Sequence, residues 1–271
     1  MGLRLAVFLI GFLCLTGSGR TLTTQTASLD LSRFDLRPFY ENDFSKSQKI
    51  TREEDLIEQA GSVWRRKAKP ANDAEWIAEG WGSAEVRNGK LLVSPSARRS
   101  HMVVWNRRIF PADFLLEIEM NPCGSTGGLT IVFFCAAGVN GEDIFDLALP
   151  PRRADYQSYH SDALTNYSDS YWSRNTEAES ISNRLRKNPV FKLVAEGPSM
   201  TTGSTDVTHH LRILKIGAHI EIEINGRIVI KWDDPDRPLG AGRIGLRSMD
   251  GVTMVAYDNF KVWQVTPKEK R

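Results

Sequence analysis

This 271-residue chain contains only three cysteines, and its 35 basic and 33 acidic residues leave a formal net charge of only +2. A balance so close to neutral is unlike that of a nucleic-acid-binding protein or of a polybasic protein that binds membrane surfaces. Long hydrophobic runs are also scarce, because nothing after residue 20 is apolar enough to cross a bilayer. We therefore expect neither nucleic acid nor a membrane among the partners of the mature protein.

The N-terminus has the pattern of a secretory signal peptide. Arg4 precedes an apolar run from Leu5 to Leu15, and small residues follow from Thr16 to Gly19. The run is too short to span a membrane as a helix, and its flanks are those of a cleaved signal. We therefore expect residues 1–19 to be a signal peptide and the protein to be secreted or periplasmic.

Secretion raises the question of a disulfide between Cys123 and Cys135. The apolar runs FLLEIEM and LTIVFF are predicted to form a hairpin around the glycine-rich segment Gly124–Gly128. In that hairpin Cys123 lies near the turn and Cys135 at the far end of the second strand. At about 3.3 Å per residue this separation is too long for a disulfide, so we expect two thiols.

Alternating strands dominate the rest of the sequence. His219–Ile224 reads HIEIEI and is followed by Asn225-Gly226, the dipeptide best suited to a two-residue hairpin turn. Many such strands, joined by short turns and without strand–helix–strand spacing, predict an all-β sandwich of two antiparallel sheets. We expect residues 70–266 to form this sandwich and residues 267–271 to be a charged tail.

A helix is predicted before the sandwich, over Arg52–Lys67. Apolar residues recur there at nearly helical spacing, and Thr51 with Glu54 has the pattern of a capping box. We therefore expect residues 20–69 to be a leader and an N-terminal extension that carries this short helix outside the sandwich.

The longest stretch without strand alternation runs from Val139 to Lys187 and is rich in acidic, aromatic and arginine residues. A sheet protein usually places its working surface in such an excursion. His101 and Trp105 lie four positions apart on one face of an earlier strand-like run, and both are expected to lie beside this excursion. The candidate ligand-binding residues are His101, Trp105, Tyr156, Gln157, Tyr159, Trp172 and Arg174, and the candidate catalytic residues are Glu142, Asp146, His160 and Tyr171.

The ordered motifs between His101 and Val265 resemble the YesU-like family of bacterial proteins. The matching stretches are HMVVWNRRIFP, VFFCAAGVNGEDIFD, DYQSYH, SYWSR, LRKNPVFKLVAEG, LKIGAHIEIEING, GRIGLRSM and AYDNFKVW. The resemblance implies a concanavalin A-like jelly roll and a glycan context, since at least one family member is encoded among genes for pectin utilisation. It implies no catalytic residue, because the family has no settled mechanism.

The acids of GEDIFD are a candidate pair for glycoside hydrolysis, which needs two carboxyl groups about 5–9.5 Å apart. On one face of an extended strand, Glu142 and Asp146 have Cα atoms about 13 Å apart, so their side chains would have to converge. Ile144 also stands where jelly-roll endoglucanases carry the middle Asp of a Glu-x-Asp-x-x-Glu run. The alternative is that these acids cap a turn after Asn140-Gly141 and pair with Arg152 or Arg153.

The Tyr, His, Trp and Arg side chains of the excursion fit other roles. A polysaccharide lyase must neutralise a uronate carboxylate, remove a proton and protonate the leaving oxygen, and His160 and Tyr171 suit proton transfer. A glycan-binding groove without chemistry would use aromatic faces and polar side chains instead, and plain surface packing is a further alternative. The sequence therefore predicts a protein that acts on or binds an acidic, pectin-like oligo- or polysaccharide of plant or algal type. Hydrolase, lyase and lectin-like module stay open.

No cofactor and no set of metal ligands is expected. The carboxylates of DDPDR, from Asp233 to Arg237, are compatible with a structural calcium ion but lack the spacing of a calcium-binding loop. Aspartates that stabilise a turn are the alternative.

Overall fold

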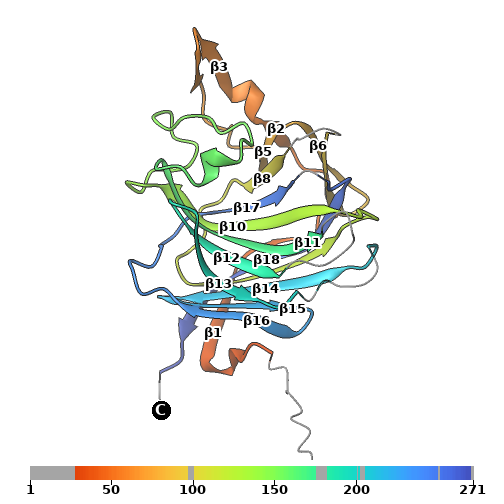
Figure 1. The fold of residues 1–271 in the computed structure, drawn as a ribbon, viewed down its shortest axis with the longest axis vertical. Coiled ribbons are helices and arrows are strands. Elements are labelled where there is room, and N and C mark those ends of the chain that lie inside the picture. Colours follow the sequence, from red (N-terminus) through yellow and green to blue (C-terminus); the bar gives the residue numbers. More distant parts are fainter. Residues whose placement is uncertain are drawn as a thin grey trace, which may run out of the picture.

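The computed structural model describes residues 28–96, 101–174, 182–199, 201, 205–249 and 251–269. Within them the chain forms a sandwich of two eight-stranded sheets, sheet A and sheet B, packed across a hydrophobic core (Figure 1). The predicted all-β sandwich is confirmed. No helix in this described part is long and apolar enough to cross a membrane. The signal-peptide prediction, residues 1–19, lies outside the described residues.

Each sheet follows its own strand order, and all neighbours are antiparallel except β2 and β5, which are parallel. Sheet A has the order β16 (Arg227–Asp233), β15 (His219–Ile224), β14 (His209–Ile216), β9 (Phe114–Asn121), β18 (Val255–Pro267), β7 (Lys90–Pro95) and β6 (Gly82–Arg87), and β1 (Phe34–Asn42) also pairs with β18. Sheet B has the order β13 (Lys192–Gly197), β12 (Asn183–Asn188), β11 (Leu164–Arg174), β10 (Gly128–Gly138), β17 (Arg243–Ser248), β8 (Met102–Asn106), β5 (Trp76–Gly80) and β2 (Ile50–Arg52). Short 3-10 turns are η1 (Leu31–Arg33), η2 (Glu53–Leu56) and η3 (Gln157–Tyr159).

The hairpin predicted at Asn225-Gly226 is confirmed. Strands β15 and β16 pair up to Ile224 opposite Arg227, which leaves these two residues as the turn. Both have positive φ, 51° and 78°, as the tight hairpin turn requires.

The helix predicted over Arg52–Lys67 is wrong. The segment contains η2 and a separate hairpin of β3 (Ile57–Ala60) and β4 (Val63–Arg66), which projects from one end of the sandwich (Figure 1). Arg52 precedes η2 without a side-chain cap, so the capping box does not form. Gly61 makes the hairpin turn at φ 63°, and the buried Glu53 and Arg66 form an ion pair at 2.8 Å. A buried tertiary contact thus overrides the helical periodicity.

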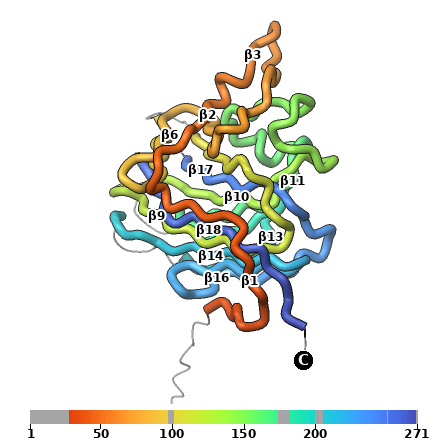
Figure 2. The backbone as a smooth tube through the Cα atoms, turned by 180° about the vertical axis from the view of Figure 1, so that it is seen from behind, coloured from red at the N-terminus to blue at the C-terminus, as the bar shows by residue number. Residues whose placement is uncertain are grey.

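The expected N-terminal extension is part of the sandwich rather than a separate leader. Strand β1 pairs with β18 from Phe34 opposite Pro267 to Asn42 opposite Phe260, and the two run side by side in Figure 2. Strand β2 pairs with β5 in sheet B. The described part of the extension therefore supplies one strand to each sheet.

The hairpin predicted around Gly124–Gly128 is wrong, although the predicted thiols are present. Strand β9 pairs with β14 and β18 in sheet A, whereas β10 pairs with β11 and β17 in sheet B. The glycine-rich segment therefore crosses between the sheets. Cys123 and Cys135 are free, and burial raises the pKa of Cys135 to about 12.

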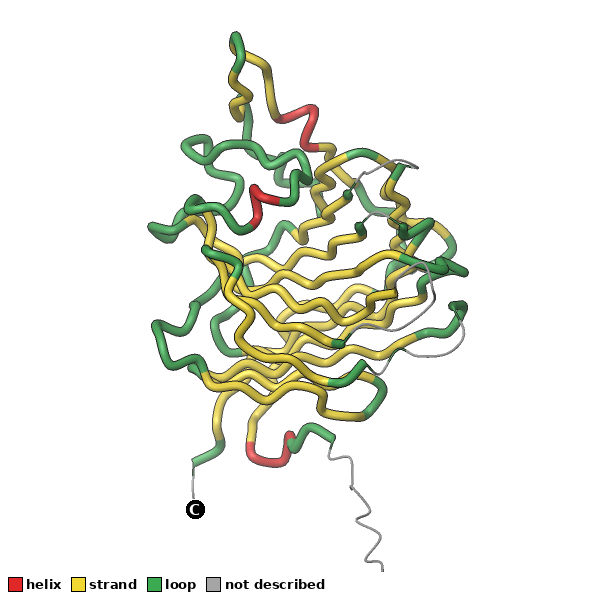
Figure 3. The backbone as a smooth tube through the Cα atoms, viewed as in Figure 1, coloured by secondary structure: helices red, strands yellow, loops and turns green. Residues whose placement is uncertain are grey.

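The outer face of sheet B is the face opposite the main core. It is covered by residues 139–163, which we term the capping segment and which form a mostly green loop region in Figure 3. This segment and the sheet share a second hydrophobic core, formed by Ile77, Val103, Trp105, Ile131, Phe133, Ile144, Phe145, Leu149 and Tyr159. The irregular excursion predicted up to Lys187 is shorter than expected, because β11 and β12 continue the sheet.

Candidate functional site

Six side chains meet on this outer face of sheet B, at the border of the capping segment. We term them the arginine–aromatic cluster: His101, Tyr156, His160, Arg186, Phe191 and Arg247. The capping segment supplies two of them around η3, strands β12 and β17 supply the arginines, and the turn between β12 and β13 supplies the phenylalanine. The sequence had predicted three of the six, and the fold brings those three together.

The rings of the cluster form a partly exposed aromatic surface. The centroid of Tyr156 lies 4.4 Å from that of His160, 5.6 Å from that of Phe191 and 6.2 Å from that of His101. The centroids of His160 and Phe191 are 4.3 Å apart. All four side chains are half-buried, so the rings are held in place by packing and still reach solvent.

Two guanidinium groups border these rings. The Arg247 guanidinium carbon lies 4.9 Å from the Tyr156 centroid, and its Nη2 donates to Nδ1 of His101 at 2.5 Å. Arg247 is fully buried, and its Nε and Nη1 have no hydrogen-bond partner among the described residues. Arg186 lies over Phe191, 4.5 Å from the centroid. No carboxylate of the described residues forms an ion pair with either arginine, and Asp155 and Glu79 act on Arg247, and Glu196 on Arg186, only from a longer distance.

The two titratable rings of the capping segment are neutral near pH 7. Burial, followed by the charge of Arg247, lowers the pKa of His160 to about 4. Burial also raises the pKa of the Tyr156 hydroxyl. The Nε2 atom of His160 is buried without a partner among the described residues. The cluster therefore presents an imidazole and a phenol beside two cations.

A buried ionic network fixes the capping segment to β5 and η2. Glu79 of β5 accepts hydrogen bonds from Arg152 Nε at 3.2 Å and from the Tyr159 hydroxyl at 2.5 Å. Glu53 accepts from the backbone N–H groups of Arg152 and Arg153, at 3.2 Å and 2.8 Å. Burial opposes ionisation of Glu79, but Arg152 and Arg66 lower its pKa below the ordinary value. The network holds η3, and with it the two rings of the capping segment, against the sheet.

Two predicted site residues lie in the main core instead. Tyr171 and Trp172 are 2% and 1% exposed, and the Tyr171 hydroxyl contacts that of Tyr257 at 3.5 Å. In the pairing of β10 with β11, Thr130 lies opposite Trp172, and the register shifts between Thr130 and Ile131. This bulge places two adjacent rings inside the sandwich, so the predicted role of Tyr171 in proton transfer and that of Trp172 in binding are wrong.

Other predicted binding residues support the cluster or lie beside it. Trp105 and Tyr159 are fully buried in the second core, with centroids 6.3 Å apart, and Trp105 Nε1 has no partner in the described part of the chain. Gln157 is exposed within η3. The side chain of Arg174 lies outside the described residues.

The predicted carboxylate pair has a turn-capping role. Glu142 accepts from the backbone N–H of Asn140 at 3.0 Å, and Asp146 accepts from the backbone N–H of Ala148 at 3.0 Å. Hydrogen bonds from Asn140 lower the pKa of Glu142, and those from Ala148 and then Lys69 lower the pKa of Asp146. Neither carboxyl keeps a proton for general acid catalysis. Both cap turns, as the alternative predicted, but among the described residues neither pairs with Arg152 or Arg153.

The aspartates of DDPDR also bond to protein donors. The Asp234 carboxylate accepts from the Tyr167 hydroxyl and lies 2.7 Å from Lys187 Nζ, and Asp233 lies 2.8 Å from His219 Nδ1. These contacts fit aspartates that stabilise a turn. In the described part of the chain no group of three or more His, Cys, Asp and Glu side chains could hold a metal ion.

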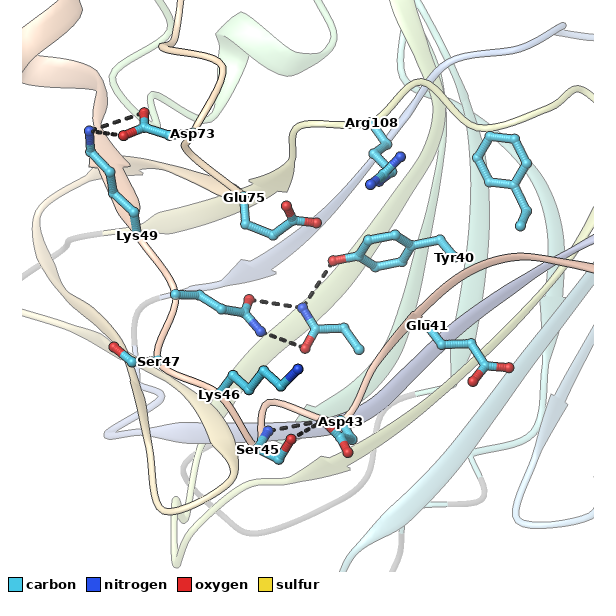
Figure 4. Close-up of a pocket in the computed structure, with 13 residues that line it drawn as sticks. Tyr40, Glu41, Asp43, Ser45, Lys46, Ser47, Lys49, Asp73, Glu75 and Arg108 are labelled. Atoms are coloured by element: carbon cyan, nitrogen blue, oxygen red, sulfur yellow. Dashed lines mark hydrogen bonds and ion pairs between the residues drawn. The ribbon is translucent and has the colours of Figure 1, made fainter.

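A larger hollow, of about 730 Å³, lies between the end of β1 and residues 43–49 (Figure 4). Its polar groups bond largely to each other. Asn42 donates to Tyr40 at 2.9 Å and to Gln48 at 2.8 Å, and Lys49 pairs with Asp73 at 2.9 Å. No site residue predicted from the sequence is among the described residues that line this hollow, whereas three of them meet in the arginine–aromatic cluster, which is therefore the stronger candidate site.

A family model described as a domain of unknown function, DUF1961, matches residues 63–262. The uncharacterized protein YesU of Bacillus subtilis (strain 168) is 28% identical over 218 residues, 77% of this chain and 98% of that protein.

Solved structures share the sandwich. A Bacillus subtilis protein of unknown function with a galectin-like fold is 25% identical and superposes with a TM-score of 0.71, over 87% of this chain and all of that one. The exoplasmic/lumenal domain of VIP36 bound to Ca²⁺ and Man2 reaches a TM-score of 0.50 at 11% identity, over 80% of this chain and 92% of that one. The latter likeness is one of fold alone.

Proposed function

This chain belongs to the DUF1961 family, as the resemblance to YesU-like proteins indicated, and from this premise we propose that it binds an acidic oligo- or polysaccharide at the arginine–aromatic cluster. The concanavalin A-like jelly-roll topology, the pectin-like character of the ligand and a secreted or periplasmic location belong to the same proposal. A signal peptide at residues 1–19 would bring the protein to where such polysaccharides occur.

One observation carries the proposal: the partly buried Arg186 has no carboxylate partner at 4 Å or less among the described residues and lies against the Phe191 ring. The fully buried Arg247 lies against the Tyr156 ring and adds its charge without contacting the ligand. A guanidinium matches the two oxygens of a carboxylate, and an aromatic face suits the C–H face of a pyranose ring. A uronate residue combines both chemistries. The saccharide-bound VIP36 domain, whose sandwich is similar, makes a sugar the first ligand class to test.

A polysaccharide lyase is the second candidate function. The observation that favours it is the neutral His160 imidazole, 4.4 Å from the Tyr156 ring and beside the Arg247 charge. Arg186, which is only partly buried, would neutralise the uronate carboxylate, and the two rings would accept and donate protons. A hydrolase finds no comparable support, because Glu142 and Asp146 are occupied in turns.

Calorimetric titration with oligogalacturonates and with their methyl-esterified counterparts tests the proposal. We expect Arg186→Gln to weaken binding of the acidic ligand about 10-fold or more, the effect of losing one charge-assisted hydrogen bond. Arg184→Gln is the matched control, since Arg184 lies on the same strand and pairs with Glu196 at 3.3 Å. Its affinity should match that of the unaltered protein.

Equal affinity for the acidic and esterified ligands, or equal losses in the two arginine variants, would contradict acidic-saccharide binding at the cluster. Absorbance of unsaturated uronates is followed in the same mixtures. Its appearance with the unaltered protein, and its loss in His160→Ala with binding retained, would decide for the lyase.

A further inference from the structure

A cleft of about 430 Å³ lies at the edge of the sandwich, where the β12–β13 hairpin of sheet B meets the end of β16 in sheet A. We term it the edge cleft. The residues that line it include Lys187, Val190, Lys192, Trp232, Asp234 and Arg237. None of these residues belongs to the arginine–aromatic cluster.

The floor of the edge cleft is built from buried, bonded groups. Asp234 is 4% exposed, accepts from the Tyr167 hydroxyl and pairs with Lys187 Nζ at 2.7 Å. Lys187 also donates to the carbonyl of Arg237 at 3.1 Å, and the Tyr167 hydroxyl accepts from the backbone N–H of Leu239 at 3.0 Å. These contacts hold the connection after β16 against β12, so the cleft is formed in the absence of a ligand.

The walls have the chemistry of a saccharide site. Trp232 is half-buried with its ring centroid 6.1 Å from that of Tyr167, and prolines and valines extend the apolar wall. Lys192 is exposed at the rim and forms no ion pair with a described carboxylate. An indole ring and an exposed cation that line the same cleft suit a pyranose ring that carries a negative charge.

One turn connects the edge cleft to the cluster. Within the loop between β12 and β13, Phe191 packs on the cluster rings, whereas Val190 and the next strand residue, Lys192, line the cleft. Val190 and Phe191 have φ of 71° and 52°, a conformation that a β-branched residue adopts only when its surroundings impose it. The alternation on β12 agrees, since Arg186 faces the cluster and Lys187 the cleft.

We propose that the edge cleft is a second saccharide subsite, which takes a further acidic sugar of the same chain that the cluster binds. The proposal rests on the proposed function and adds that the ligand is an oligosaccharide long enough to pass over the turn at residues 188–191. Affinity should therefore rise with chain length until the ligand reaches Trp232.

Titration of oligogalacturonates of increasing length into the unaltered protein and three variants tests this. We expect chains that span the turn to bind the unaltered protein about 10-fold more tightly than a disaccharide does, a gain that one additional sugar contact supplies. Lys192→Gln and Trp232→Phe should each remove most of that gain and leave disaccharide affinity unchanged. Lys192 is exposed, so its substitution tests the cleft even where the Trp232 variant folds poorly.

Lys231→Gln is the matched control, because Lys231 is also an exposed lysine, adjoins Trp232 in the chain and pairs with Glu221 on sheet A at 2.9 Å. It should leave the length dependence intact. An unchanged length dependence in Lys192→Gln and Trp232→Phe, with disaccharide still bound, would overturn the second subsite and leave the cluster proposal standing. Absence of binding at every length would overturn the proposed function itself, and the subsite with it.

Discussion

The hydroxyl of Tyr159 donates a 2.5 Å hydrogen bond to the carboxylate of Glu79, and both side chains are completely buried. Glu79 belongs to the sheet and Tyr159 to the capping segment, 80 residues later in the chain. Arg247 also lies over the Tyr159 ring, 4.8 Å from its centroid. The bond therefore connects the scaffold to the layer directly beneath the arginine–aromatic cluster.

We expect Tyr159→Phe to lower the free energy of unfolding by about 1–3 kcal/mol, because the buried Glu79 carboxylate loses a hydrogen-bond donor. Urea denaturation followed by tryptophan fluorescence measures the change. Tyr156→Phe is the control, since the half-buried Tyr156 ring lies beside the cluster arginines and forms no described hydrogen bond through its hydroxyl. Equal stability of the Tyr159 variant and the unaltered protein would show that the bond to Glu79 contributes nothing.

Alternation in the sequence predicted the sandwich because it reports directly which face of a strand is buried. It could not predict the partner of each strand. The Gly124–Gly128 segment is equally compatible with a hairpin and with a crossing between sheets, and the structure has the crossing. At Arg52–Lys67 the helical spacing was genuine, but the buried pair of Glu53 with Arg66 is a tertiary contact that a local pattern does not contain.

Only three of the six residues of the arginine–aromatic cluster were predicted, again because the sequence does not show which strands are neighbours. His101, Tyr156 and His160 stood out because they lie in or beside an irregular, aromatic stretch. Arg186 and Arg247 lie in regular strands, and only the order of sheet B brings them to the same face. The strand pattern does not single them out, because the residues two positions away on the same face are Gly245 and Met249 for Arg247, and Arg184 and Asn188 for Arg186.

The two thiols should differ in reactivity. In the folded protein we expect Cys123, which is half-buried, to react with a maleimide well before Cys135, whose burial raises its pKa to about 12. After unfolding without a reductant, both should be labelled. Intact mass spectrometry counts the labels, and a molecule that takes none after unfolding would contain a disulfide that contradicts the free cysteines.

Two histidines should titrate on opposite sides of the ordinary value. Burial and Arg247 lower the pKa of His160 to about 4. Burial also opposes protonation of His219, but hydrogen bonds to Glu221 and Asp233 raise its pKa above the ordinary value. NMR titration of the imidazole C–H signals, assigned with His160→Gln and His219→Gln, measures both midpoints. A His160 midpoint near 6.5 would mean that its ring is solvated and the cluster more open than its contacts indicate.

Asp169 is a carboxyl group inside the main core. It is completely buried on β11, Asn183 Nδ2 lies 3.4 Å from one of its oxygens, and the other oxygen has no partner among the described residues. Burial raises its pKa to about 8. The folded protein therefore keeps the proton near pH 7, whereas the unfolded chain releases it near the ordinary value of about 3.9.

The sign of the resulting pH dependence follows from proton counting. Between about pH 4 and pH 8 the folded state binds one more proton than the unfolded state at this residue, so its contribution to stability falls as pH rises, by up to about 1.4 kcal/mol per pH unit. Asp169→Asn removes the titratable carboxyl group and keeps nearly the same side-chain shape. We expect its free energy of unfolding, relative to that of the unaltered protein, to rise between pH 5 and pH 7 by about 1–3 kcal/mol. Urea denaturation at both pH values measures the difference, with Asp162→Asn, an exposed residue before β11, as the control. A difference that does not change with pH would mean that Asp169 is ionised in the folded protein and that a donor reaches its second oxygen.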